Sequence, residues 1–87
     1  SGFVQSVYKH FGYSIPRTSR EQAAGGTEIS ISELMPGDLI FYATGGRIDH
    51  VTMYIGDGQV VQASSPSTGI VVSRYDYRTP VKAVRYI

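Results

Sequence analysis

The chain of 87 residues has the size of one small domain, and its 41% apolar residues can build one modest core. A net charge of +1 gives none of the basic excess that usually marks nucleic-acid-binding proteins, so no nucleic-acid partner is expected. No apolar run approaches the roughly 20 residues of a membrane-spanning helix. The absence of cysteine from the 87 residues excludes disulfides and cysteine-based metal sites within them.

The first third of the chain predicts two helices. Apolar residues recur at helical spacing before a stop at Gly12: Phe3, Val4, Val7, Tyr8 and Phe11. Thr18 and Glu21 fit a capping box that begins a second, short helix, which Gly25 and Gly26 end. The chain therefore begins at or near a helix N-terminus.

The rest of the chain predicts strands. Apolar or alternating segments bounded by turn residues cover 39–42, 50–55, 59–63, 70–75 and 81–86. Helices followed by an antiparallel meander of about five strands predict an α+β domain.

The most informative segment is the hairpin signal Gly56-Asp57-Gly58. A three-residue loop at 56–58 pairs Ile55 with Gln59 and places His50 and Gln62 on one face as diagonal neighbours, roughly 7–8 Å apart. A two-residue loop would instead place Gln62 on the opposite face from His50. The register of this hairpin decides whether the two side chains meet.

A histidine beside a glutamine can act as a general base if the amide orients the imidazole ring. We expect Gln62 to accept a hydrogen bond from Nδ1 of His50, which leaves Nε2 to face a nucleophile. A neutral amide suits a cysteine nucleophile best, because a thiolate–imidazolium pair can form before substrate arrives. A helix N-terminus would lower the pKa of such a thiol.

Several segments, in this order, resemble the NlpC family. Ser1-Gly2-Phe3 resembles the residues after the nucleophile in the family motif Asp-Cys-Ser-Gly-Phe. Further matches follow at Pro16-Arg17-Thr18-Ser19, Pro36-Gly37-Asp38-Leu39-Ile40-Phe41-Tyr42, Asp49-His50-Val51 through Tyr54-Ile55-Gly56, and Gln62-Ala63-Ser64. Together these matches cover nearly the whole chain.

The resemblance implies a papain-like cysteine peptidase that cuts the stem peptides of bacterial peptidoglycan, typically between D-γ-glutamyl and a diamino acid. His50 would be the general base and Gln62 the third, ring-orienting residue. The cysteine would immediately precede Ser1, so residues 1–87 would form one N-terminally incomplete domain that is inactive by itself. Thr52 stands where the family usually has a small residue, which would narrow the groove.

Ser1, Arg17 and Ser64 are the candidate substrate-binding residues. Arg17 could contact a free carboxylate of a stem peptide, and Ser64 shares the predicted face of His50. Asp49, as the sequence neighbour of His50, is expected to point to the opposite face. The two histidines lie too far apart for zinc-ligand spacing, so neither a metal nor a cofactor is expected.

The resemblance also implies a bacterial protein that is secreted or held in the cell envelope, and a monomer whose partner is the peptidoglycan stem peptide. Two alternatives remain open. One is a non-catalytic, wall-binding copy of the domain that keeps the groove without the nucleophile. The other is a lipid- or amide-processing enzyme on the same papain-like layout. A cysteine before Ser1 would favour the peptidase over the binding module.

Overall fold

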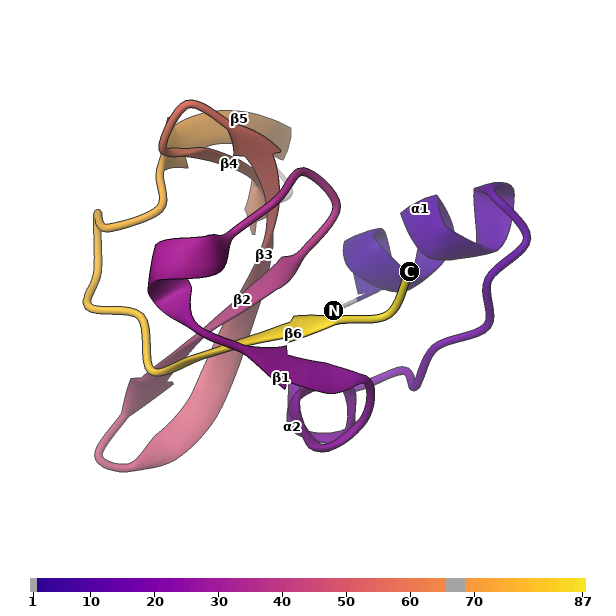
Figure 1. Ribbon diagram of the computed structural model, residues 1–87, viewed down its shortest axis with the longest axis horizontal. Coiled ribbons are helices and arrows are strands. Elements are labelled where there is room, and N and C mark those ends of the chain that lie inside the picture. Colours follow the sequence, from indigo (N-terminus) through magenta and orange to yellow (C-terminus); the bar gives the residue numbers. More distant parts are fainter. Residues whose placement is uncertain (1, 66–68) are drawn as a thin grey trace.

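The computed structural model describes residues 2–65 and 69–87 (Figure 1). The helical elements in these ranges are α1 (Gly2–His10), α2 (Ser19–Ala24) and the short 3-10 turn η1 (Ile31–Glu33). The strands are β1 (Thr27–Ile29), β2 (Leu39–Thr44), β3 (Arg47–Gly56), β4 (Gln59–Ser65), β5 (Gly69–Arg74) and β6 (Lys82–Arg85). Neither α-helix is long or apolar enough to cross a bilayer in the part of the chain described.

Both helices begin or end at the predicted signals. Thr18 caps α2, since its hydroxyl accepts a hydrogen bond from the backbone N–H of Glu21 at 3.2 Å. After α1, Gly12 adopts a φ of 87°, a left-handed conformation that favours glycine and stops a helix. Phe11 belongs to the predicted apolar stripe but is 70% exposed, because α1 ends at His10 and the chain has already turned.

The sheet confirms the predicted α+β class. Its strand order is β1-β6-β2-β3-β4-β5, and each neighbouring pair is antiparallel. Strands β2 to β5 form the predicted meander, whereas β6 returns across the sheet to lie between β1 and β2. Strand β1 was not predicted, because three residues are too few to show an alternating pattern.

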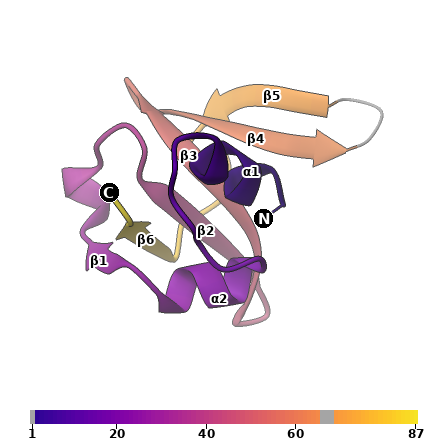
Figure 2. The same cartoon turned by 90° about the vertical axis from the view of Figure 1, so that its right-hand side faces the viewer.

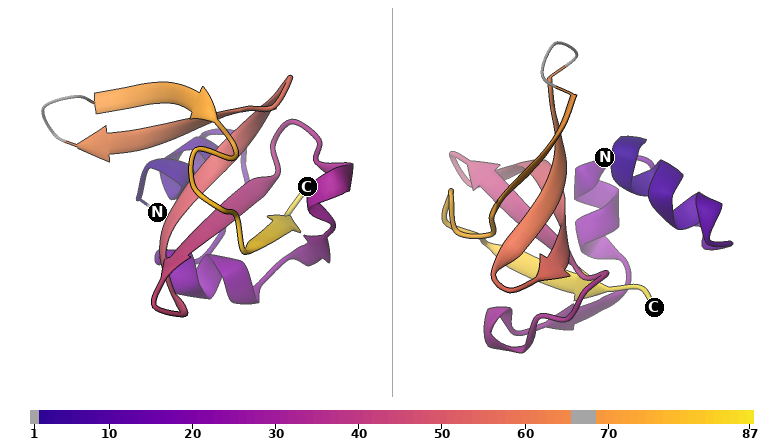
Figure 3. Two further views of the ribbon diagram at one scale, coloured as in Figure 1. Left: turned by 90° about the vertical axis from the view of Figure 1, so that its left-hand side faces the viewer. Right: turned by 90° about the horizontal axis from the view of Figure 1, so that it is seen from above.

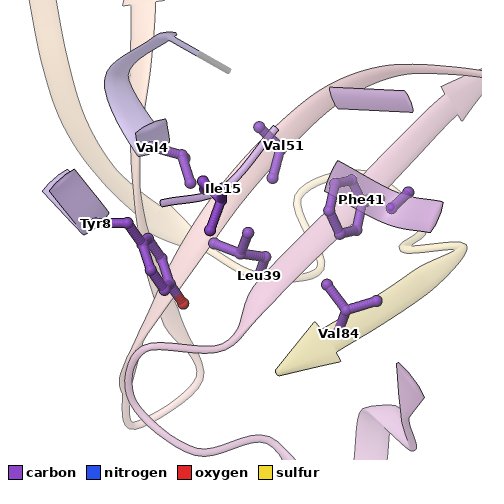
Figure 4. Close-up of a cluster of buried hydrophobic side chains, with 8 residues drawn as sticks. Val4, Tyr8, Ile15, Leu39, Phe41, Val51 and Val84 are labelled. Carbon is purple, nitrogen blue, oxygen red and sulfur yellow. The ribbon is translucent and has the colours of Figure 1, made fainter. Parts of the chain in front are cut away.

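The central strand β2 is buried on both faces of the sheet. Leu39 and Phe41 pack on one face with Val4 and Tyr8 of α1, as Figure 4 shows, and Ala23 of α2 joins the same cluster. The other face holds a second cluster of Ile40, Tyr42, Val60 and Ala83. Both helices therefore cover the same face of the sheet (Figure 2).

Asp38 joins the turn before β2 to β6. Its carboxylate, 2% exposed, accepts hydrogen bonds from the backbone N–H of Met35 at 2.8 Å and from two guanidinium nitrogens of Arg85, each at 2.8 Å. The hydrogen bond and the charge of Asp38 raise the pKa of Arg85. Asp38 thus joins two segments far apart in the chain through partly buried hydrogen bonds.

Replacement of Asp38 by Asn should therefore destabilise the fold. Every partner of the carboxylate is a donor, so the amide NH₂ of Asn would face another N–H and lose at least one bond. We expect a loss of about 2–3 kcal/mol in the free energy of unfolding, measured by urea denaturation. Asp57→Asn is the matched control, because Asn tolerates the left-handed conformation of that exposed turn residue equally well. Equal stabilities of the two variants would contradict the role given to Asp38.

Candidate active site

The hairpin between β3 and β4 closes with a two-residue turn, Asp57-Gly58. Gly56 pairs with Gln59, and the φ angles of Asp57 and Gly58 are 54° and 74°. Positive φ at both central residues is typical of a type I′ turn, which an Asp-Gly pair favours. The predicted three-residue loop was wrong, because the turn is one residue shorter.

A β-bulge nevertheless restores the predicted register. Beyond the turn, Tyr54 pairs with Val60 and Met53 with Val61, so Ile55 is an extra residue on β3. The same register continued by one residue places Gln62 opposite Thr52 and diagonal to His50. The bulge thus brings Gln62 to the face of His50. The sequence predicted the same face, but from a three-residue loop that the structure does not contain.

His50 and Gln62 are in direct contact. Nε2 of His50 lies 2.6 Å from Oε1 of Gln62, whose side chain is buried. The structure differs from the prediction in the ring nitrogen used: Nε2, at the far tip of the ring, reaches the neighbouring strand, and Nδ1 does not contact Gln62. Nδ1 makes no hydrogen bond to the residues that the structure describes.

Gln62 is held at both ends of its amide. Nε2 of Gln62 donates to Oγ of Ser73 on β5 at 3.1 Å, and the phenol of Tyr77 donates to Oε1 of Gln62 at 3.0 Å. Tyr77 lies in the connection between β5 and β6, which has no regular secondary structure. A shallow depression is lined by these side chains and their neighbours: Asp49, His50, Gln62, Val71, Ser73, Tyr77 and Arg78.

Tyr42 lies beneath this depression. Its ring packs against His50 at a centroid distance of 6.1 Å, and its hydroxyl donates to the backbone carbonyl of Tyr75 at 2.6 Å. Burial raises the pKa of Tyr42 to about 12. Thr52, which was expected to narrow the groove, is instead completely buried, with its hydroxyl 3.4 Å from that of Tyr42.

Asp49 reaches the same depression as His50, contrary to the prediction. The pairing of β2 with β3 shifts between Tyr42 and Ala43, so the alternation of side chains is interrupted at Asp49. The carboxylate of Asp49 accepts from the hydroxyl of Thr44 at 2.6 Å and from Arg78 at 3.2 Å. The hydrogen bond from Thr44, followed by that from Arg78, lowers the pKa of Asp49. The rim of the depression therefore carries a fixed ion pair.

Helix α1 contacts both β3 and β4, the strands that carry His50 and Gln62, and its N-terminal end lies beside β3 (Figures 2 and 3). Arg17 is exposed in the connector between the helices and lines a separate hollow with α1 residues such as Gln5 and Lys9. Ser1 lies outside the described residues, and Ser64 is described only as part of the backbone of β4. The substrate-binding roles of Ser1, Arg17 and Ser64 stay predictions.

The sequence did not identify Ser73, Tyr77, Tyr42 or Arg78 as site residues. Ser73 could have been found from the register of β4 with β5, since it pairs with Val60 and so shares the face of Gln62. Tyr77 and Arg78 follow the last residue of β5 and carry no periodic signal. Only the path of this connection past β2 places them beside His50.

A model of the NlpC/P60 family matches residues 1–85. The chain belongs to the NlpC/P60 family. This confirms the resemblance drawn from the ordered motifs.

Relatives with assigned names are similar over most of the chain. A probable endopeptidase of Corynebacterium glutamicum is 40% identical over 86 residues, which cover 99% of this chain and 40% of the relative. A γ-D-glutamyl-L-lysine dipeptidyl-peptidase of Bacillus subtilis is 42% identical over 72 residues, or 79% of this chain and 24% of the relative. The chain thus spans less than half the length of these relatives.

Solved structures share the fold. An NlpC/P60 family protein from Bacillus cereus has a TM-score of 0.90 at 32% identity, covering 97% of this chain and 30% of that one. The peptidoglycan hydrolase RipB of Mycobacterium tuberculosis has a TM-score of 0.87 at 36% identity over the whole of this chain and 44% of its own. RipD of the same organism, described as non-catalytic and adapted to peptidoglycan binding, has a TM-score of 0.85 at 28% identity, covering 99% of this chain and 64% of its own.

The raised pKa of Tyr42 predicts a loss of stability at alkaline pH. The unfolded chain ionises its tyrosines near pH 10, whereas folded Tyr42 keeps its proton until about pH 12, so the folded state binds more protons in between. The free energy of unfolding should fall as pH rises from about 10 to 12. Tyr42→Phe should make this fall shallower, as measured by urea denaturation at a series of pH values. An identical slope in the variant would contradict the burial of the phenol.

Proposed function

We propose that this chain is the larger part of a cysteine endopeptidase domain that hydrolyses peptidoglycan stem peptides. The observation that carries the proposal is the 2.6 Å contact between His50 and Gln62, with Gln62 itself bound by Ser73 and Tyr77. This arrangement fixes one nitrogen of the imidazole and leaves the other to act as a general base. It is the part of a nucleophile–base–orienting triad that residues 1–87 contain.

The nucleophile in this proposal is a cysteine directly before Ser1. Its thiol would stand at the N-terminal end of α1, where the helix dipole stabilises a thiolate. His50 would accept the thiol proton at Nδ1, the thiolate would attack the scissile carbonyl carbon, and His50 would return the proton to the leaving amine. Water would then hydrolyse the thioester. Since the 87 residues contain no cysteine, we expect them to be inactive alone.

The named relatives support the substrate class. The Bacillus subtilis relative is a γ-D-glutamyl-L-lysine peptidase and RipB is a peptidoglycan hydrolase. We therefore propose a bond between D-γ-glutamyl and a diamino acid as the site of cleavage. Such a substrate lies outside the cytoplasm, so the protein would act in the bacterial envelope or after secretion, as a monomer and without a cofactor. Ser1, Arg17 and Ser64 are the proposed substrate contacts.

A non-catalytic wall-binding module is the second candidate. The similarity to RipD, which is described as a non-catalytic domain adapted to peptidoglycan binding, favours it specifically. The fold and the depression around His50 suit either function, because both need a groove for a stem peptide. The residue before Ser1 distinguishes them, and an intact mass with peptide mapping of the full gene product identifies it.

The activity test uses the full gene product with purified peptidoglycan. The native protein should release soluble stem-peptide fragments, detected by liquid chromatography and mass spectrometry. His50→Ala should lower kcat/KM by about 10²–10⁴-fold, because the general base is lost. The matched control is His10→Ala, which removes an exposed histidine in the last turn of α1 and should leave activity unchanged.

Two results would overturn the peptidase proposal. One is a residue other than cysteine before Ser1 together with retained binding to peptidoglycan, which would establish the wall-binding module. The other is a cysteine-containing protein whose peptide-bond cleavage is indifferent to His50→Ala.

A further inference from the structure

The amide of Gln62 has two ends of nearly the same shape and opposite hydrogen-bonding character. We infer that Tyr77 and Ser73 are positioning residues that select the amide orientation of Gln62 and, through it, the His50 tautomer with its proton on Nε2. The catalytic part of this inference rests on the proposed function, whereas the tautomer itself can be measured without any activity.

The oxygen of the amide is saturated in the observed orientation. Oε1 of Gln62 lies 2.6 Å from Nε2 of His50 and accepts from the phenol of Tyr77 at 3.0 Å. A carbonyl oxygen offers two lone pairs, so these two donors use both. Because Oε1 cannot donate, the ring nitrogen facing it must carry the proton, and Nδ1 of neutral His50 is then unprotonated and basic.

The reversed amide would serve His50 poorly. Its NH₂ group would face Nε2, which would force the proton onto Nδ1 and remove the basic nitrogen from the groove. When His50 becomes imidazolium, both of its ring nitrogens carry a proton. The NH₂ group of the reversed amide would then face the N–H at Nε2, and two donors cannot form a hydrogen bond with each other. The observed orientation suits both the neutral base and the imidazolium that proton transfer produces.

Tyr77 is held where its hydroxyl can enforce this choice. Its ring packs edge-on against Tyr42 at a centroid distance of 5.2 Å and an interplanar angle of 60°. Tyr42 in turn donates to the carbonyl of Tyr75, and the N–H of Tyr75 donates to the carbonyl of Gly58 at 2.9 Å. The turn that carries Tyr77 is therefore tied both to β2 and to the β3–β4 hairpin.

Ser73 acts on the other end of the amide. It pairs with Val60, so its side chain lies on the same face as Gln62, one diagonal step away. Its hydroxyl accepts from Nε2 of Gln62 at 3.1 Å. Either hydroxyl can donate or accept, but a phenol donates more strongly and accepts less strongly than a serine hydroxyl. With the phenol at the oxygen and the serine hydroxyl at the nitrogen, the pair favours the observed orientation of Gln62. A carboxylate at position 62 would not need this pair, because its two oxygens are equivalent acceptors.

The first test measures the tautomer of His50 by long-range ¹H–¹⁵N correlation spectra of the full gene product. The native protein should show neutral His50 with its proton on Nε2. Tyr77→Phe keeps the ring but removes the donor, and it should convert this single tautomer into a mixture. The matched control is Tyr75→Phe in the same turn, because its phenol bonds to no part of the chain that the structure describes while its backbone contacts to Tyr42 and Gly58 remain.

Ser73 provides an independent variant. Ser73→Ala should also give mixed tautomers, whereas Ser73→Thr keeps a hydroxyl and should preserve the native spectrum. A single Nε2-protonated tautomer in both Tyr77→Phe and Ser73→Ala would overturn the inference. Thermal unfolding of each variant shows whether it is folded. If one variant is unfolded, its spectrum is set aside, and the tautomer of His50 in the other variant tests the inference.

The second test is kinetic and uses peptidoglycan fragments. Tyr77→Phe should lower kcat by about 3- to 10-fold at unchanged KM, the size expected for one lost hydrogen bond. In a Gln62→Ala background the same substitution should have no effect, because Tyr77 acts through Gln62. Equal losses in both backgrounds would overturn the positioning role. Complete inactivity of the native protein would refute the proposed function alone, and the spectra would still decide the tautomer.

Discussion

The structure depends above all on the register of the β3–β4 hairpin. A type I′ turn at Asp57-Gly58 would by itself pair the strands so that Gln62 faces away from His50. The extra residue Ile55 shifts the pairing by one and returns Gln62 to the face of His50. Because side chains alternate with a period of two, this single bulge determines whether the pair at the centre of the site exists.

The site is built from three levels of support. β3 and β4 supply His50 and Gln62, Ser73 and Tyr77 bind the two ends of the Gln62 amide, and Tyr42 anchors the turn that carries Tyr77. Each level rests on hydrogen bonds that burial removes at least partly from water; the bond of Tyr42 goes to a backbone carbonyl, and the others join side chains. Buried polar groups are costly when unpaired, so the network favours one arrangement over its alternatives.

Strand β2, which carries Tyr42, links this network to the hydrophobic core. Leu39 and Phe41 pack under the two helices, while Ile40 and Tyr42 face the opposite cluster. Tyr42 therefore belongs both to a core cluster and to the floor beneath His50. A substitution that disturbs the packing of β2 would move the site as well, which couples fold stability to the geometry of the proposed base.

The sequence alone determined the α+β class and both helices, because these depend on local periodicity and capping residues, and its ordered motifs determined the family. The face shared by His50 and Gln62 was predicted from a loop that the structure does not contain, so the bulge at Ile55 decided it. Tertiary structure decided which nitrogen of His50 meets Gln62, since that depends on the reach of a side chain from a neighbouring strand. It also decided the place of β6 between β1 and β2, and the presence of Tyr77 and Arg78 at the site. These features join segments distant in the chain, and no local pattern encodes the path of an irregular connection.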